Sequence, residues 1–133
     1  MAKIIDGKTV SASVKQKVAD ECAELFKTTE KKPGLAVIIV GDDPASKVYV
    51  NNKKKACELV GFLSKEYALP AQTTQQELME LVEKLNNDDE INGILCQLPL
   101  PKHLDEKAVI EAISPKKDVD AFHAVNVGKI MIG

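Results

Sequence analysis

Three side chains that can do chemistry recur at helical spacing in one short segment. Ser46, Tyr49 and Lys53 occupy positions i, i+3 and i+7, so they share one face if the segment is helical. The adjacent cations Lys54 and Lys55, together with partial burial, disfavour a further proton on Lys53. Such a lysine suits a general base or a proton shuttle. The spacing alone also fits an aromatic residue at a core edge beside a solvated lysine run.

A second candidate is Gln97, which is followed by Leu-Pro-Leu-Pro at 98–101. Two prolines directly after an apolar run fix φ and end strand pairing. Gln97 is therefore expected at the end of a strand, where its amide can hydrogen-bond a catalytic group. The alternative is a rigid turn with an incidental glutamine.

Two acids, Asp118 and Asp120, flank a single apolar residue in the segment 115–120. In an extended segment their side chains point to the same side. A carboxylate in such a loop can accept paired N–H donors from a heterocycle. The composition of the segment alone also describes an ordinary charged loop.

The elements that must position these residues alternate between helix and strand. Helices are predicted over 9–29, 44–60, 105–113 and after a Thr74–Glu77 capping box, and strands over 35–40, 62–69 and 93–97. This order predicts an α/β fold with three α-β-α layers and a mainly parallel sheet. Because the carboxyl ends of parallel strands share one edge, we expect the three candidate segments to meet there.

Start and stop signals sharpen the helix after the first strand. Asp43 is expected to cap its N-terminus, Pro44 to be its first residue and Gly61 to end it.

The bulk composition is that of one globular domain. The 133 residues are 44% hydrophobic and 29% charged, and the formal net charge of −2 gives no electrostatic reason to expect a nucleic acid as partner. No apolar run approaches the roughly 20 residues that span a membrane, and no signal or transit peptide is recognised. We therefore expect a cytoplasmic protein without a membrane or nucleic-acid partner.

Several other site classes are disfavoured by the sequence. Cys22, Cys57 and Cys96 lie far apart without a CxxC pair, so they are interpreted as small core residues in a reducing compartment, and no metal is expected. His103 and His123 show no ligand or triad pattern and are interpreted as surface or loop histidines. The chain contains no GxGxxG, GxxxxGK[ST] or GxSxG motif.

Taken together, the motifs resemble the bifunctional methylenetetrahydrofolate dehydrogenase / methenyltetrahydrofolate cyclohydrolase (FolD) family. The resemblance runs from residue 4 to about 129, and the segments that carry it are IIDGK at 4–8, VGDDPASKVYVNNKKKACELVGF at 40–62, GILCQLPLP at 93–101 and PKKDVDAFHAVNVGK at 115–129. The first of these looks like the opening strand of the family.

The resemblance implies a role for each candidate residue. Lys53 matches the family's catalytic lysine, and Gln97 matches the glutamine that positions and tunes it. Tyr49 matches the tyrosine that stacks on the folate ring system, and Asp120 matches the aspartate that grips the pterin. Ser46 matches a polar residue near the same site.

The resemblance also implies an activity in one-carbon metabolism that serves purine biosynthesis. The whole enzyme would be an oxidoreductase and hydrolase that oxidises 5,10-methylenetetrahydrofolate with NADP and hydrolyses the product to 10-formyltetrahydrofolate. Residues 1–133 would be the folate-binding catalytic domain, with NADP held mainly by a Rossmann-type domain that this chain does not contain. The whole enzyme is expected to be a homodimer, and this chain a monomer or a weak dimer.

Two departures from the family and two alternatives accompany this prediction. Members of the family are about twice as long as this chain, so the chain alone is not expected to have dehydrogenase activity. The family usually has glycine at the position of Ala121, so a positive φ there would strain the alanine. The chain can instead be a truncated fragment that binds folate, or only folds, without catalysis. A third alternative is the substrate domain of another α/β dehydrogenase.

Overall fold

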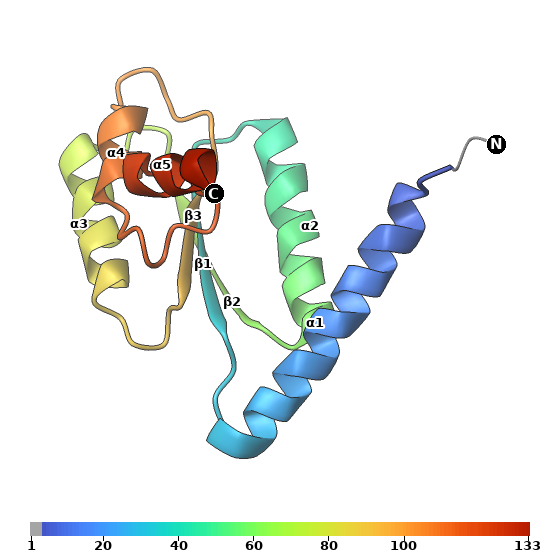
Figure 1. Cartoon of the computed structure of the whole chain (residues 1–133). Helices are drawn as coiled ribbons and strands as arrows, with labels where there is room; N and C mark the ends of the chain where they lie inside the picture. Colours follow the sequence, from blue (N-terminus) through green and yellow to red (C-terminus); the bar gives the residue numbers. More distant parts are fainter. Residues whose placement is uncertain (1–3) are drawn as a thin grey trace.

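The computed structural model describes residues 4–133, in which helices surround a small sheet (Figure 1). The elements in chain order are α1 (Gly7–Thr29), β1 (Gly34–Val40), α2 (Pro44–Val60), β2 (Leu63–Leu69), α3 (Gln75–Asn86), β3 (Gly93–Cys96), α4 (Glu106–Ala112) and α5 (Ala124–Ile132). The predicted strands and the second, third and fourth helices are confirmed to within a residue or two at their ends.

The sheet has the strand order β2-β1-β3, and both neighbours of β1 run parallel to it. Ile38 pairs with Cys96, so the carboxyl ends of β1 and β3 lie at the same edge of the sheet. The prediction of an α/β fold with a mainly parallel sheet is therefore confirmed, and this edge is where ligands bind in such folds.

Alternation along β1 divides the core into two layers. Ala36, Ile38 and Val40 belong to a buried cluster that includes Leu78 of α3 and Val109 of α4. The intervening residues Val37 and Ile39 pack with Val50 of α2 and Leu95 of β3. Helix α2 therefore covers one face of the sheet, and α3 and α4 cover the other (Figure 1). Each fully buried aliphatic side chain contributes about 1.5–3 kcal/mol of burial free energy.

The expected helix signals have the expected geometry. The Asp43 carboxylate accepts a hydrogen bond from the Ser46 N–H at 2.7 Å, and Pro44 is the first residue of α2. Gly61 ends α2 in the left-handed region at φ 86°. Thr74 and Glu77 form the capping box at the start of α3.

The predicted opening strand at 4–8 is wrong. Helix α1 already begins at Gly7, because the Asp6 carboxylate caps it by accepting from the Lys8 N–H at 3.1 Å. The helix itself is confirmed, but none of its 23 residues is buried. Its apolar stripe is only partly covered, with Phe26 46% exposed, and α1 extends as an arm beside α2 (Figure 1).

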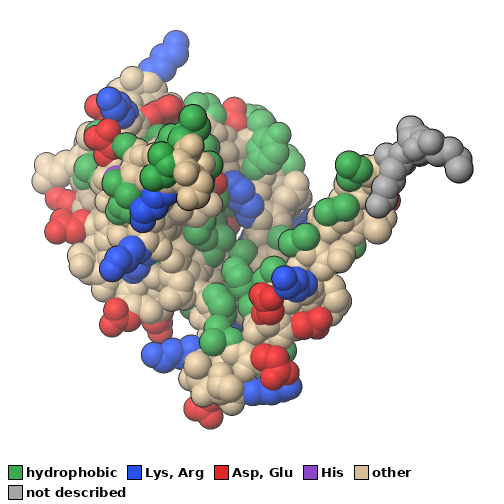
Figure 2. Space-filling model, viewed as in Figure 1, with side chains coloured by type: hydrophobic (Ala, Val, Ile, Leu, Met, Phe, Trp, Pro, Cys, Tyr) green, Lys and Arg blue, Asp and Glu red, His purple; other side chains and the backbone are tan. Residues whose placement is uncertain are grey.

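Helix α5 has no counterpart among the predicted elements. His123 caps it by accepting a hydrogen bond from the Val125 N–H at 3.1 Å, and histidine is not among the usual capping residues. The helix leaves Ile130 and Met131 exposed. Hydrophobic side chains also line the furrow between the α1 arm and the body in the space-filling view (Figure 2).

Candidate active site

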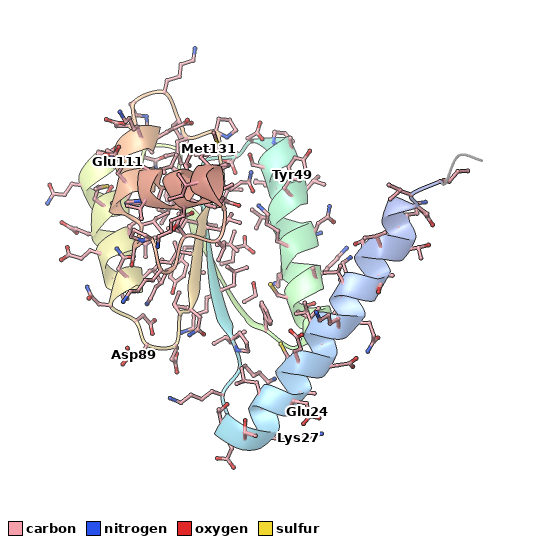
Figure 3. The ribbon with its side chains drawn as sticks, in the orientation of Figure 1. Glu24, Lys27, Tyr49, Asp89, Glu111 and Met131 are labelled. Atoms are coloured by element: carbon pink, nitrogen blue, oxygen red, sulfur yellow. The ribbon has the colours of Figure 1, made fainter. Side chains whose placement is uncertain are left out.

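Helix α2 presents the first group of candidate residues from its N-terminal half. Ser46 is 4% exposed and sits in the capped first turn, whereas Tyr49 is 60% exposed and leaves its ring accessible (Figure 3). Lys53 lies further along the same face and is half-buried. Asp43 and Pro44 fix the residue at which α2 begins, and this start determines where Lys53 lies along the helix relative to the sheet edge.

Lys53 reaches the end of β3. Its Nζ donates a hydrogen bond to Oε1 of Gln97 at 2.9 Å. Nε2 of the Gln97 amide donates to the Leu98 carbonyl at 2.9 Å, which leaves Oε1 free to accept from the amine. The backbone N–H of Gln97 donates to Ile38 O at 2.8 Å, so the residue is held by the last sheet hydrogen bond of its strand. The structure therefore brings these two candidate residues together.

The turn after Gln97 is anchored to α4. Glu106 accepts a hydrogen bond from the Leu100 N–H at 2.7 Å, and Leu100 is buried. The prolines at 99 and 101 remove backbone donors, so this one amide and its carboxylate partner carry the anchoring. Gln97 consequently projects from a rigid base.

Asp120 completes the cluster from the loop between α4 and α5. Desolvation of its carboxyl raises its pKa, the positive charge of Lys53 lowers it, and the negative charge of Asp118 raises it further; the net direction is upward. The Asp120 carboxyl therefore lies within electrostatic range of the Lys53 amine. At the carboxyl edge of the sheet that amine is hydrogen-bonded to the Gln97 amide.

Asp118 has different partners from Asp120. Its Oδ2 accepts from the His123 N–H and from Nδ2 of Asn126, each at 2.9 Å. Burial opposes ionisation of Asp118, but hydrogen bonds from Asn126 and from the backbone of His123 outweigh it and lower its pKa. Sequence reasoning missed Asn126, since no local spacing rule pairs an acid with an asparagine eight positions later.

Ala121 adopts the left-handed conformation that the sequence analysis considered, with φ at 56°. This region costs an L-residue roughly 1–2 kcal/mol, so the tight bend after Asp120 is maintained by contacts elsewhere in the loop.

The histidines and cysteines make none of the hydrogen bonds of the Lys53–Gln97 pair. His103 Nε2 contacts the Thr73 carbonyl at 2.8 Å, and His123 caps α5. Cys57 and Cys96 are buried, as expected of core residues, whereas Cys22 is only half-buried on α1. Burial raises the pKa of Cys96 to about 12. Across residues 4–133 the structure shows no group of three or more His, Cys, Asp or Glu side chains that could hold a metal ion. No helix in this same range is long and apolar enough to cross a membrane.

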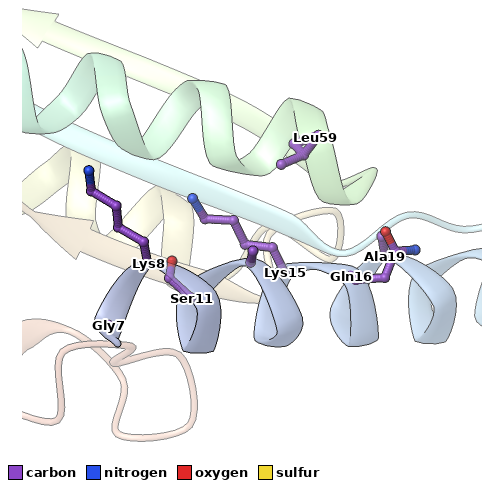
Figure 4. Close-up of a pocket in the computed structure, with 8 residues that line it drawn as sticks. Gly7, Lys8, Ser11, Lys15, Gln16, Ala19 and Leu59 are labelled. Carbon is purple, nitrogen blue, oxygen red and sulfur yellow. The ribbon is translucent and has the colours of Figure 1, made fainter. Parts of the chain in front are cut away.

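Two open cavities flank α2 without including Lys53 or Gln97. One, of about 580 Å³, lies between α1 and α2 and is lined by Gly7, Lys8, Ser11, Ala12, Lys15, Gln16, Ala19 and Leu59 (Figure 4). The other, of about 490 Å³, lies between α2 and the ends of β1 and β2. The Lys53–Gln97 pair therefore lies outside both of these cavities.

Comparison with known proteins identifies the family of the chain. The sequence profile of the "Tetrahydrofolate dehydrogenase/cyclohydrolase, catalytic domain" family matches residues 5–120. The bifunctional protein FolD of Acetivibrio thermocellus is 61% identical over 132 residues, which are 99% of this chain and 46% of the relative. The chain thus spans about half the length of the curated relatives it matches.

Solved structures give the same result. The bifunctional FolD enzyme of Campylobacter jejuni superposes with a TM-score of 0.91 at 45% identity, covering 96% of this chain and 45% of that one. The FolD of Trypanosoma brucei, solved with NADP cofactor and inhibitor, superposes with a TM-score of 0.93 at 38% identity, covering 98% and 44%. These matches decide against the substrate domain of another kind of α/β dehydrogenase. The chain belongs to the tetrahydrofolate dehydrogenase/cyclohydrolase catalytic-domain family.

Proposed function

We propose that this chain is the folate-binding catalytic domain of a bifunctional methylenetetrahydrofolate dehydrogenase / methenyltetrahydrofolate cyclohydrolase. The observation that carries the proposal is the hydrogen bond from Lys53 to Gln97 beside Asp120, at the sheet edge where α/β folds bind ligands. Family membership supports the same substrate class.

Each side chain has a part in the proposed binding. The exposed ring of Tyr49 stacks on the flat folate ring system. Asp120 accepts N–H donors from the pterin, which needs the carboxylate in its ionised form. Ser46 is buried beneath this surface and supports its first turn.

The hydrolytic step needs proton movement at Lys53. Water adds to the carbon that bridges N5 and N10 of the methenyl cation and loses a proton. The bond from that carbon to N5 then breaks as N5 takes up a proton and the new hydroxyl loses its proton to become the formyl carbonyl. The product is 10-formyltetrahydrofolate, and one proton is released overall. Lys53 moves these protons, Gln97 fixes the position of its amine, and positioning of water against the cation supplies further rate.

In the whole protein, NADP would accept a hydride from 5,10-methylenetetrahydrofolate. The chain has no dinucleotide-binding fingerprint, so the residues that hold NADP are assigned to the remainder of the protein and no step here depends on them. As a whole the enzyme would be a cytoplasmic homodimer in one-carbon metabolism that serves purine biosynthesis, and this chain a monomer or weak dimer.

The test is the loss of methenyltetrahydrofolate absorbance in the presence of this chain. A loss above the buffer rate that disappears in Lys53→Ala but persists in Lys54→Ala would support the proposal, because Lys54 is an exposed neighbour on the same helix. Equal hydrolysis by the chain and by Lys53→Ala would refute the role of Lys53.

The second candidate function is a domain that binds folate without catalysis, and a binding measurement distinguishes it from the first. The observation behind it is that the chain matches only about half the length of its relatives. Saturable binding of methenyltetrahydrofolate without hydrolysis would establish that candidate, whereas absence of binding would refute both.

A further inference from the structure

The loop that carries Asp120 is fastened to the sheet on one side. The N–H of Ile94 donates to the Lys117 carbonyl at 2.7 Å, and Ile94 and Asp118 form a parallel bridge beside β3. Val119 packs over Gly93, where an added Cβ would lie 2.5 Å from Val119 Cγ1. A side chain at position 93 would therefore have to displace the Val119 side chain.

The same loop is closed on its other side by hydrogen bonds. Asn126 Nδ2 donates to Asp118 Oδ2 at 2.9 Å and to the Pro115 carbonyl at 2.8 Å. The His123 N–H donates to the same Asp118 oxygen. The Asp118 carboxylate and the Asn126 carboxamide therefore hold together the two ends of the loop that contains residues 119–122.

Asp120 and the strained Ala121 lie inside this closure. An alanine at φ 56° reverts to an ordinary conformation unless its surroundings prevent it. The closure supplies that restraint, because a change of φ at Ala121 would move His123 away from Asp118.

We propose that Asp118 and Asn126 are positioning residues for Asp120, whose carboxylate they hold toward Lys53; this rests on the proposed function of Asp120 as the pterin-binding group. The pair acts through the loop and does not itself touch the substrate. Of the two acids in the motif, Asp118 holds the loop in place and Asp120 binds the pterin.

The charges at the site agree with this division. Hydrogen bonds from Asn126 and from the loop backbone lower the pKa of Asp118, so it is ionised when it holds the closure. The charged groups that act on Asp120 are Lys53 from α2 and Asp118 from its own loop. The effect of Lys53 on the Asp120 carboxyl therefore measures whether Asp120 still faces α2.

If Asp118 and Asn126 only stabilised the fold, the effect of Lys53 on the pKa of Asp120 would be unchanged in variants that still fold. The experiment is a titration of the Asp120 carboxyl by carbon-13 NMR in this chain, with and without Lys53→Met. In the wild-type chain and in Lys129→Ala, an exposed control on α5, removing the Lys53 charge should raise the pKa of Asp120. In Asp118→Ala and in Asn126→Ala, removing the Lys53 charge should raise the pKa of Asp120 by less than half as much.

Asp118→Asn provides a rescue arm, since its carboxamide keeps an oxygen acceptor and should retain most of the Lys53 effect. If Asp118→Ala does not fold, Asn126→Ala carries the comparison. A Lys53 effect of full size in both Asp118→Ala and Asn126→Ala, or in folded Asn126→Ala alone, would overturn the proposal.

A second measurement links the closure to the substrate. The dissociation constant of methenyltetrahydrofolate should rise about tenfold in Asp118→Ala and remain unchanged in Lys129→Ala, because a misplaced carboxylate loses a charge-assisted hydrogen bond. If the wild-type chain binds no folate, the proposed function fails in this chain, while the carboxyl titration still decides whether Asp118 and Asn126 position Asp120.

Discussion

Lys53 and Gln97 are 44 positions apart in the sequence, yet Nζ of one donates to Oε1 of the other at 2.9 Å. The contact joins the middle of α2 to the residue after β3, on the edge where β1 and β3 end together. The Leu98 carbonyl holds the amide in the orientation that this contact needs. The amine is thereby held over the sheet edge instead of extending into water like its neighbours.

Replacing Gln97 by leucine should test the value of that orientation. The leucine side chain would keep the approximate volume but remove the acceptor, so we expect hydrolysis of methenyltetrahydrofolate to fall about 10- to 100-fold, as for loss of a hydrogen bond to a charged group. The absorbance assay measures it, with Gln72→Leu in an exposed turn as the matched control. Unchanged turnover in Gln97→Leu would contradict a positioning role for the amide.

Asp120→Asn should stabilise the chain at neutral pH. Folding raises the pKa of this carboxyl, so the ionised form opposes folding, and that penalty is present above the raised pKa and absent below the unfolded value. We expect a gain below about 1 kcal/mol at pH 7, since solvent screens an exposed group, and no difference near pH 3.

Thermal unfolding at both pH values measures the effect, with exposed Asp89→Asn as the control. Folate binding should weaken in the same variant, because the neutral amide loses the charge-assisted contact. A variant less stable than wild type at pH 7 would show that hydrogen bonds, and not desolvation, dominate at this carboxyl.

Substitutions of Ala121 should act in opposite directions. Glycine removes the strain at φ 56° but adds freedom to the unfolded chain, so Ala121→Gly should gain about 0.5–1 kcal/mol. Valine is stiffer at this φ, so Ala121→Val should lose more than about 1 kcal/mol. Denaturant titration measures the change in the free energy of unfolding of each variant. Changes of the same sign in both variants would exclude backbone strain at residue 121 as the cause of those changes.

The three cysteines should react with a thiol reagent at very different rates. Burial raises the pKa of Cys96 to about 12 and also raises that of Cys57, while Cys22 is only half-buried. At pH 8 we expect Cys22 to be modified first and Cys96 last, since the thiolate is the reactive form. Mass spectrometry of partly labelled chain measures the order, and in denaturant the three rates should converge.

Much of the arrangement follows from signals within single segments. The β1 run, the Asp43–Pro44 start, the Gly61 stop and the Thr74–Glu77 box are local patterns, and each element has the predicted form. The meeting of Lys53 and Gln97 follows from the parallel sheet, since such strands end at one edge.

The remainder depends on contacts that sequence spacing does not encode. The family resemblance implies an opening strand at IIDGK, but Asp6 caps a helix there. Helix α5 depends on a histidine cap and on the Asp118–Asn126 hydrogen bond between distant positions. Asp118 and Asp120 are alike in sequence, and only the folded loop separates their roles.

The lack of any buried residue in α1 has a consequence for how the domain opens. A helix held by so little burial can detach at a small fraction of the free energy needed to disrupt the β1 core. Its amides should exchange with deuterium through local opening, whereas those of Ile38 and its neighbours should exchange only when the whole domain unfolds. The chain thus consists of a stable sheet core and a helix, α1, that can unfold separately. On heating or on addition of denaturant, α1 should unfold before the core.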